Sequence, residues 1–483
     1  MKIVIKGSTL VCPCEQTPSR RLWLSTIDVM YTDRGYVALL FFYKFDGSPN
    51  FFDPLVLKES LSKVLVPFYP VAGRLTRDGN SRIEIDCNGQ GVLYAEAVSD
   101  SPMSDIGGFN SGLELVKVFP PINRSLHDLY SSPLFAVQVT RFSCGGVSLG
   151  IGCHHNLSDG TGFLNFITSW SELARGLSTS MPPLLDRDIL RARVPPTPVF
   201  YHHEFDKPPV MITSFTQNSE ESSSSKADSS IVLEITSDHM KTLVSMIGDE
   251  RTKIKYTRYE ILSAFLWRVA CKARNLPDTQ ATKMRIPING RPRLNPPIPP
   301  NYFGNALFIC TTTALCGELV SEPFAHSVDR IHEAIRRMDD KYLRSALDFL
   351  DKTDELTTIM QGPQNTACPN FSIVSWKSFP FHGVNFGWGQ PYMRPASIFA
   401  GKGYVLASPT DKEGLMLAIC LEAEHIQAFL ELFHASFQVR ANSYNKKRFN
   451  VLLSLLLEVT ALLSLVFFFD QQSFVILPFL LQL

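Results

Sequence analysis

The chain has 483 residues, of which 45% are hydrophobic, so it is long enough to form two or more domains with ordinary cores. Lys plus Arg and Asp plus Glu both number 46, and the formal net charge is therefore zero. Without an excess of positive charge to attract a polyanion, the composition argues against a nucleic-acid partner.

The cysteines and the N-terminus indicate a cytoplasmic protein. The ten cysteines include no C-x-x-C pair and no histidine at zinc-ligand spacing, so we interpret them as reduced thiols and expect no metal site. At the N-terminus, Lys6 interrupts the apolar run after three residues, which is too short for the core of a secretory signal.

A hairpin followed by a helix is predicted in the first half. Two apolar runs at 135–142 and 147–153 flank a glycine-containing turn, as expected for paired strands. Apolar residues then recur at helical spacing from 163 to 173, with Asp159 placed to cap the helix. Residues 154–158 are therefore expected to form a strand-to-helix corner.

Periodicity fades between residues 177 and 230, where a proline-rich stretch precedes the serine-rich segment 218–225. We interpret 177–230 as a crossover between two halves and expect its serine-rich part to be mobile. The second half opens with a strand at 231–236 and continues with a helix at 259–273. Alternating strands and helices predict a mixed α/β (α+β) fold. The predicted domains on either side of the crossover are 1–176 and 231–439.

The C-terminal extension, residues 440–483, is strongly apolar. Residues 451–469 contain one charge, Glu458, and as a helix they would span ~28 Å, about the thickness of a bilayer core. Basic residues at 446–448 precede them, as is usual on the cytoplasmic side of a membrane span. Two interpretations stay open: a tail anchor at a membrane, or an extension from a mis-spliced reading frame, which the untypical closing sequence favours.

The corner carries residues that suit general-base chemistry. His155 follows the second strand of the hairpin, and Asp159 and Gly160 come four and five residues later. A neutral imidazole, with an ordinary pKa of about 6.5, can take a proton from a hydroxyl or an amine. This short string also arises by chance, and a packed histidine is the alternative. A zinc site built on His154, His155 and Asp159 is disfavoured, because adjacent side chains point apart and no further ligand follows.

A second string far downstream, Phe386-Gly-Trp-Gly389, completes a pair of signatures. Together with His155-x-x-x-Asp159-Gly160 it resembles the BAHD acyltransferases of plants. The similarity runs from about Lys2 to Phe437 and includes Tyr302-Phe-Gly-Asn305. It resembles most the branch that transfers hydroxycinnamoyl groups to shikimate or quinate.

The resemblance implies two chloramphenicol-acetyltransferase-like domains with a channel between them. A hydroxycinnamoyl-CoA, either 4-coumaroyl-CoA or caffeoyl-CoA, would enter as co-substrate from one face and the acceptor from the other, with no permanently bound cofactor. Such an internal channel requires no second subunit, so we expect a monomer.

The resemblance also assigns roles to individual residues. His155 deprotonates the acceptor in a ternary complex, without an acyl-enzyme. Asp159 is structural and pairs with Arg291. Trp376 lies near the developing oxyanion, or simply packs in the channel wall. The resemblance implies contacts with coenzyme A for a larger set of residues. Within it, Arg258 and Arg293 would bind phosphate groups, and the alternative is that they are solvated surface residues. This set is Thr257, Arg258, Tyr259, Glu260, Asn289, Gly290, Arg291, Arg293 and Ser375.

The sequence departs from the shikimate branch on the acceptor side. Gln361 stands where the branch has an arginine that grips the acceptor carboxylate. Polar positions are replaced by Val37, Leu39, Phe41 and Val374. These changes predict an apolar acceptor pocket in which shikimate and quinate bind poorly.

Two acids of the family pattern are also replaced, by Asn289 and by Asn385. We expect these changes to weaken structural pairing and not the chemistry. The departures motivate an alternative function, in which the chain is a catalytically weak relative that binds acyl-CoA or a partner protein and uses its tail as a membrane tether.

Overall fold

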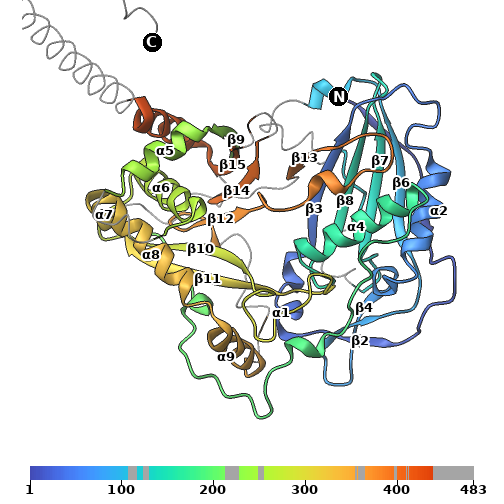
Figure 1. Cartoon of the computed structure of the whole chain (residues 1–483), viewed down its shortest axis with the longest axis horizontal. Coiled ribbons are helices and arrows are strands. Elements are labelled where there is room, and N and C mark those ends of the chain that lie inside the picture. Colours follow the sequence, from blue (N-terminus) through green and yellow to red (C-terminus); the bar gives the residue numbers. More distant parts are fainter. Residues whose placement is uncertain are drawn as a thin grey trace, which may run out of the picture. The chain divides into compact units, whose positions relative to one another are not determined.

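In the computed structural model, two six-stranded sheets organise the residues from Met1 to Gln427 (Figure 1). Residues 428–483 form a second unit, whose described part, 428–438, is helical. The structure describes residues 1–106, 117–122, 130–212, 228–248, 255–353, 356, 365–395, 400–408, 411 and 413–438.

The first sheet is built mainly by the N-terminal half, and its strands follow the order β1-β6-β7-β8-β3-β13. The predicted hairpin is confirmed as β7 and β8, which pair antiparallel from Phe135 opposite Cys153 to Arg141 opposite Val147. The strands of this sheet are β1 (Ile3–Val11), β6 (Val92–Ser99), β7 (Phe135–Arg141), β8 (Val147–His154), β3 (Tyr36–Tyr43) and β13 (Tyr392–Pro395). A small sheet beside it has the order β2 (Arg21–Trp23), β5 (Ile83–Asp86) and β4 (Arg74–Arg77).

Helices α2 (Pro54–Val64) and α4 (Gly160–Ala174) pack together with this sheet around one apolar core (Figure 1). Asp53 caps α2 by accepting from the backbone N–H of Leu55, and Pro54 suits the first helical position because it needs no backbone donor. Trp170 of α4 is completely buried, and its indole N–H donates to the Leu57 carbonyl at 3.0 Å. The short helix α1 (Thr26–Val29) precedes the turn η1 (Thr32–Arg34).

The second sheet has the order β11-β10-β12-β14-β15-β9. Its central strand β12 runs parallel to both β10 and β14. Its strands are β11 (Leu307–Leu315), β10 (Ala281–Asn289), β12 (Phe371–Ser375), β14 (Lys402–Ala407), β15 (Leu415–Glu422) and β9 (Asp228–Ile235). The helices of this half are α5 (Ser237–Ser245), α6 (Arg258–Ala273), α7 (Cys316–Ser321), α8 (Phe324–Arg336) and α9 (Asp340–Asp351).

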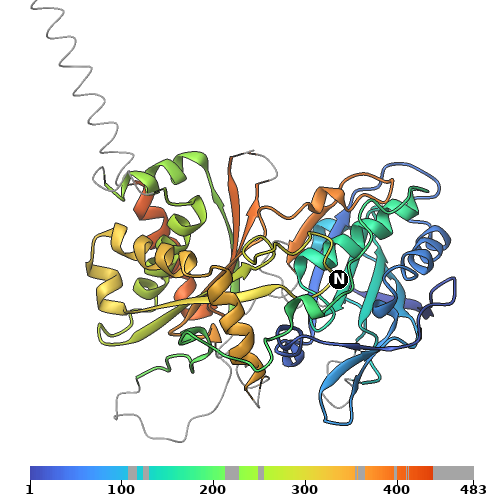
Figure 2. The ribbon, with the colours of Figure 1, turned by 60° about the horizontal axis from the view of Figure 1, so that its bottom comes forward.

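One strand crosses from the second half of the chain to the first sheet. After β12 the chain reaches β13, which pairs antiparallel with β3 from Tyr392 opposite Phe42 to Pro395 opposite Leu39 (Figure 2). The predicted division into 1–176 and 231–439 places β13 in the second domain, whereas the strand pairs with β3 of the first sheet. The sequence pattern does not reveal this pairing, because the two strands are about 350 residues apart.

Two predictions fall on residues that the structure does not describe. They are the mobility of the serine-rich segment 218–225 and the tail anchor within 440–483. Among the residues described, no helix is long and apolar enough to cross a membrane. All ten cysteines lie in the described part, and each is a free thiol.

Candidate active site

The corner after β8 places His155 at the edge of a cavity. The backbone N–H of His155 donates to the Gly35 carbonyl at 2.8 Å, and that of Leu157 donates to the His154 carbonyl at 2.9 Å. Helix α4 then begins at Gly160, with Asp159 as its N-cap. The corner is thus held by backbone hydrogen bonds on both sides of the imidazole.

The two adjacent histidines point to different surroundings. His154 is 1% exposed, stands edge-on to the Tyr36 ring, and burial lowers its pKa to about 3. His155 is half-buried and lines the cavity. No cluster of three potential metal-ligating side chains occurs in the described part of the chain.

A single amide fixes the proton on the His155 ring. Asn305 lies with Oδ1 3.0 Å from Nδ1 of His155. The Nδ2 group of Asn305 donates to the His155 carbonyl at 2.7 Å and to Oδ1 of Asp28 at 2.8 Å. Both of those partners are acceptors, so the amide nitrogen must face them and its oxygen must face the ring. His155 therefore carries its proton on Nδ1, and the lone pair of Nε2 is free to act as a base.

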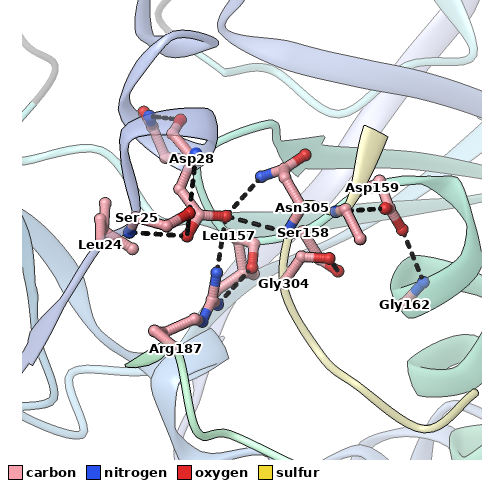
Figure 3. Close-up of polar contacts among 12 residues, drawn as sticks. Leu24, Ser25, Asp28, Leu157, Ser158, Asp159, Gly162, Arg187, Gly304 and Asn305 are labelled. Carbon is pink, nitrogen blue, oxygen red and sulfur yellow. Dashed lines mark hydrogen bonds and ion pairs between the residues drawn. The ribbon is translucent and has the colours of Figure 1, made fainter. Parts of the chain in front are cut away.

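Asp28 anchors this amide from the N-terminal lobe, the part of the chain that is built around the first sheet (Figure 3). Its Oδ1 also accepts from the backbone N–H of Asn305 at 2.8 Å. Arg187, in the crossover, pairs with the same oxygen at 2.7 Å and donates to the Leu157 carbonyl at 2.7 Å. The side chains of Arg187 and Asp28 are only 1% and 0% exposed. The crossover thus supports the corner through a buried ion pair.

Tyr31 covers one face of the His155 ring. The two rings are stacked, with centroids 4.1 Å apart and an interplanar angle of 9°. The Tyr31 hydroxyl donates to the Leu307 carbonyl at 3.1 Å. Burial, and secondly the positive charge of Arg34, lower the pKa of His155 to about 4. The ring is thus neutral at physiological pH.

Asp159 is occupied by structural contacts. It forms the implied ion pair with Arg291, with 2.7 Å between Arg291 Nη1 and Oδ2. It also accepts from the backbone N–H of Ala306 and from that of Gly162, the latter shown in Figure 3. Burial alone would raise the pKa of Asp159, but Arg291 and these donors outweigh it and hold that pKa below its ordinary value.

A cavity of about 260 Å³ extends from His155 between the two lobes. Trp376 forms part of its wall, with the ring centroid of Tyr404 4.5 Å from its own. Several predicted site residues line this cavity together. They are Val37, His155, Asp159, Asn289, Arg291, Val374, Ser375 and Trp376.

Two residues of the predicted acceptor side are placed differently, and a third is not described. Leu39 and Phe41 are 4% and 0% exposed in the core of the N-terminal lobe and do not line the cavity. Gln361 lies outside the described residues. Arg34, Arg285 and Lys402 line the cavity as well, so it is more polar than the substitutions in the sequence predict. Local sequence patterns do not report which charged residues from distant strands reach a common space.

The predicted coenzyme A residues at the start of α6 make contacts within the protein. Thr257 caps the helix by accepting from the backbone N–H of Glu260, whose carboxylate accepts from that of Thr257. Arg258 pairs with Glu413 at 3.2 Å, and the Tyr259 hydroxyl donates to the Ile373 carbonyl at 2.7 Å. None of these four predicted residues is among those that line the described cavity.

Other predicted contacts lie at the end of β10, which Asn289 closes, and directly after it. Arg293 donates to the carbonyl of Ile335, in the last turn of α8, and to that of Met338 just beyond the helix. Gly290 donates its backbone N–H to the Ala306 carbonyl at 2.8 Å. Asn289, which replaces an acid, accepts from the backbone N–H of Arg291 at 3.1 Å.

The Phe386-Gly-Trp-Gly389 string is part of the N-terminal core. Phe386 is 1% exposed and packs edge-on against Trp170, with centroids 4.8 Å apart. Gly387 and Gly389 have φ of +102° and +98°, a conformation that other residues rarely adopt. Asn385 accepts from the Gly387 N–H at 2.9 Å. The string therefore shapes the loop that leads into β13.

Several residues of the site were not singled out by sequence reasoning. Asn305 lies in a segment that carries the family resemblance, which is the one signal that pointed to it. No signal in the sequence pointed to the other site residues, because each acts through a partner far away in the chain. These residues are Asp28, Tyr31, Arg34 and Arg187.

Comparison with known proteins agrees with this architecture. A model of the Transferase family matches residues 1–436. Shikimate O-hydroxycinnamoyltransferase of Nicotiana tabacum is 44% identical over 431 residues, covering 89% of this chain and 98% of that protein. A hydroxycinnamoyl-CoA:5-hydroxyanthranilate N-hydroxycinnamoyltransferase of Avena sativa is 38% identical over 444 residues, covering 89% and 99%. The crystal structure of vinorine synthase has a similar fold, with a TM-score of 0.67 at 19% identity, covering 88% and 96%.

Two sheet-centred lobes with a cavity between them, together with these relatives, define a two-lobed acyltransferase. The chain belongs to the Transferase family, the BAHD acyltransferases, as the two sequence signatures predict.

Proposed function

We propose that this acyltransferase moves a hydroxycinnamoyl group from coenzyme A to an alcohol or amine acceptor, with His155 as the general base. The relatives support this reaction class, because one is named for O-acylation of shikimate and another for N-acylation of 5-hydroxyanthranilate. The co-substrate is an acyl-CoA, 4-coumaroyl-CoA or caffeoyl-CoA, and no permanently bound cofactor takes part.

The observation that carries the proposal is the fixed proton of His155. Asn305 holds the Nδ1–H tautomer, so the Nε2 lone pair belongs to a neutral, half-buried ring that lines the cavity. A general base must be unprotonated and reachable by the acceptor. The lowered pKa of His155 meets the first condition, and its place in the cavity wall meets the second.

The reaction then proceeds in one ternary complex. Nε2 of His155 takes the proton of the acceptor hydroxyl or amine as its oxygen or nitrogen attacks the thioester carbonyl. The C–S bond breaks as the tetrahedral intermediate collapses, and the thiolate of coenzyme A takes the proton back from Nε2. The indole N–H of Trp376 stabilises the oxyanion, since a preorganised donor in a site shielded from water lowers such a barrier by roughly 3 kcal/mol.

Shikimate and quinate are proposed to be poor acceptors. Val37 and Val374 line the cavity and offer no partner to a ring hydroxyl that lies against them, so such a hydroxyl would lose its hydration without compensation. The neutral composition and the reduced cysteines support a cytoplasmic enzyme. A site completed by residues of one chain supports a monomer.

The test uses the full-length protein with 4-coumaroyl-CoA and a panel of alcohols, amines and shikimate, following release of free thiol. Turnover with at least one acceptor that disappears in His155→Ala supports the proposal. His203→Ala is the matched control, because that side chain is 59% exposed and paired with Asp206 on the surface. Binding of acyl-CoA without transfer to any acceptor would support the alternative of a catalytically weak acyl-CoA-binding protein.

A further inference from the structure

Two positively charged side chains stand in one row across the second sheet. Arg285 of β10 lies opposite Ser372 of β12, and Ser372 lies opposite Lys402 of β14. Residues opposite each other on adjacent strands project from the same face of a sheet. All three line the cavity that contains His155. The wall that this sheet contributes is therefore cationic along this row.

Arg34 brings a third positive charge from the N-terminal lobe. It ends the turn η1 and lines the same cavity, and its buried Nε has no hydrogen-bond partner in the described part of the chain. The Nζ atom of Lys402 lies over the ring of Tyr404, 4.9 Å from its centroid. The one carboxylate in the described cavity wall, Asp159, is occupied by Arg291.

Neighbouring positive charges disfavour the protonated forms of Lys402 and Arg285. Burial, followed by the charges of Arg34 and Arg285, lowers the pKa of Lys402 to about 7. Burial and then Arg34 lower the pKa of Arg285 to about 9. Positive charges that raise each other's free energy are relieved when an anion binds among them. The cavity is thus built to gain from a negatively charged ligand.

We infer that Arg34, Arg285 and Lys402 form a carboxylate-binding subsite for the acceptor. The acceptor is then an aromatic acid whose ring lies against apolar wall residues such as Val37, Val374 and Trp376, and whose amine or hydroxyl faces His155. This inference rests on the proposed function and names its acceptor class. The sequence, with Gln361 in place of an arginine, predicts an apolar acceptor pocket. We infer a positively charged subsite in its place.

Phosphate groups of coenzyme A are the other source of negative charge. The cations, however, line the same cavity as the base, where the reacting carbonyl must sit. In coenzyme A the pantetheine arm separates the phosphates from the thioester. A carboxylate on a small acceptor can reach the base and the cations together, whereas the phosphates cannot do so while the thioester is at His155.

The test compares each acid with its own uncharged analogue in the full-length enzyme. Amino- and hydroxybenzoates would be assayed with 4-coumaroyl-CoA beside the matching benzamides, and shikimate would be included. Because a hydrogen bond to a charged group is worth more than one to a neutral group, we expect kcat/KM about 10- to 100-fold higher for at least one acid than for its amide. Shikimate, with a carboxylate but a hydroxylated ring, should be used less well than that acid.

Lys402→Met should abolish this preference by raising KM for the acid about 10- to 100-fold, while KM for 4-coumaroyl-CoA stays within about twofold. Lys402→Arg should retain the preference. Lys63→Met, an exposed lysine in the last turn of α2, is the matched control. Thermal-shift titration with the same acids and amides reports binding without turnover, and only the acids should raise Tm.

Equal use of acids and amides, or equal thermal shifts, would overturn the inference while leaving acyl transfer intact. A Lys402→Met defect confined to the KM of acyl-CoA would instead assign the cations to coenzyme A phosphates. Failure of the proposed function looks different, because no acceptor, acid or amide, would then release free thiol.

Discussion

Asn305 joins the side chain and the backbone of His155: its Oδ1 lies 3.0 Å from ring Nδ1, and its Nδ2 donates to the His155 carbonyl at 2.7 Å. This two-point contact fixes the tautomer of the ring and the path of the chain at the corner together. Asn305 is therefore a positioning residue, and it acts through the base without touching the reacting atoms.

Asn305→Ala should reduce kcat about 100-fold, because a loosely held base spends little time in the productive geometry. KM for acyl-CoA should change little, since the cavity walls stay in place. Steady-state kinetics against each substrate would separate the two effects. Asn50→Ala, at an exposed position, serves as control. A variant with normal kcat would contradict the positioning role.

His155→Ala and Asp159→Asn should separate chemistry from stability. The first change should abolish turnover while leaving Tm close to that of the wild type. The second leaves the Arg291 guanidinium buried without its charged partner, which should cost about 3–5 kcal/mol of unfolding free energy. Thermal and denaturant unfolding of both variants would test this.

For comparison, Asp188→Asn breaks an exposed pair with Arg191 and should change stability by at most about 1 kcal/mol. If Asp159→Asn were as stable as the wild type, the Asp159–Arg291 pair would not be the structural element described above.

Arg187→Met should weaken the corner through Asp28. Removing the guanidinium leaves a buried carboxylate without its counter-charge, so we expect a loss of about 3–5 kcal/mol together with a fall in kcat. Adding Asp28→Asn should restore part of the stability, because the uncompensated charge disappears. The unfolding free energies of the wild type, the two single variants and the double variant measure the coupling between Arg187 and Asp28. Additive effects of the two changes would argue against this coupling.

The acid limb of the pH–rate profile should report His155. Burial and then Arg34 lower the pKa of His155 to about 4. The base therefore stays unprotonated at pH values well below 6.5, the ordinary pKa of histidine. With an uncharged acceptor, kcat/KM should therefore fall only as the pH approaches about 4. Arg34→Met removes a positive charge, so this limb should move to higher pH. An unchanged limb would show that Arg34 does not act on the ring.

Acceptor binding should depend on pH through Lys402. Its pKa is lowered to about 7 by burial, Arg34 and Arg285, and the Tyr404 phenol beside it has its pKa raised to about 12 by burial. Lys402 attracts a carboxylate when it is protonated and loses this attraction when it is neutral. The KM for an acidic acceptor should therefore rise above about pH 7. In Lys402→Arg this rise should vanish, and KM for the matching amide should be independent of pH throughout. A pH-independent KM for the acid in the wild type would contradict the role of Lys402.

The sequence alone was sufficient where the interactions are local. The alternating and helical patterns around residues 135–173 predicted the β7–β8 hairpin, helix α4 and its Asp159 cap, because strand pairing across a tight turn and helix capping involve neighbours in the chain. The two signatures identified the family, and the resemblance to it assigned the role of general base to His155.

Tertiary structure decided what joins segments far apart in the chain. Asn305 meets His155 across 150 residues and Asp28 across 277. The parallel register of β10, β12 and β14 brings Arg285 and Lys402 to one wall, and β13 leaves its own half to pair with β3. No local pattern encodes such contacts, because they form only when the whole core packs and buried polar groups must find partners wherever the chain supplies them.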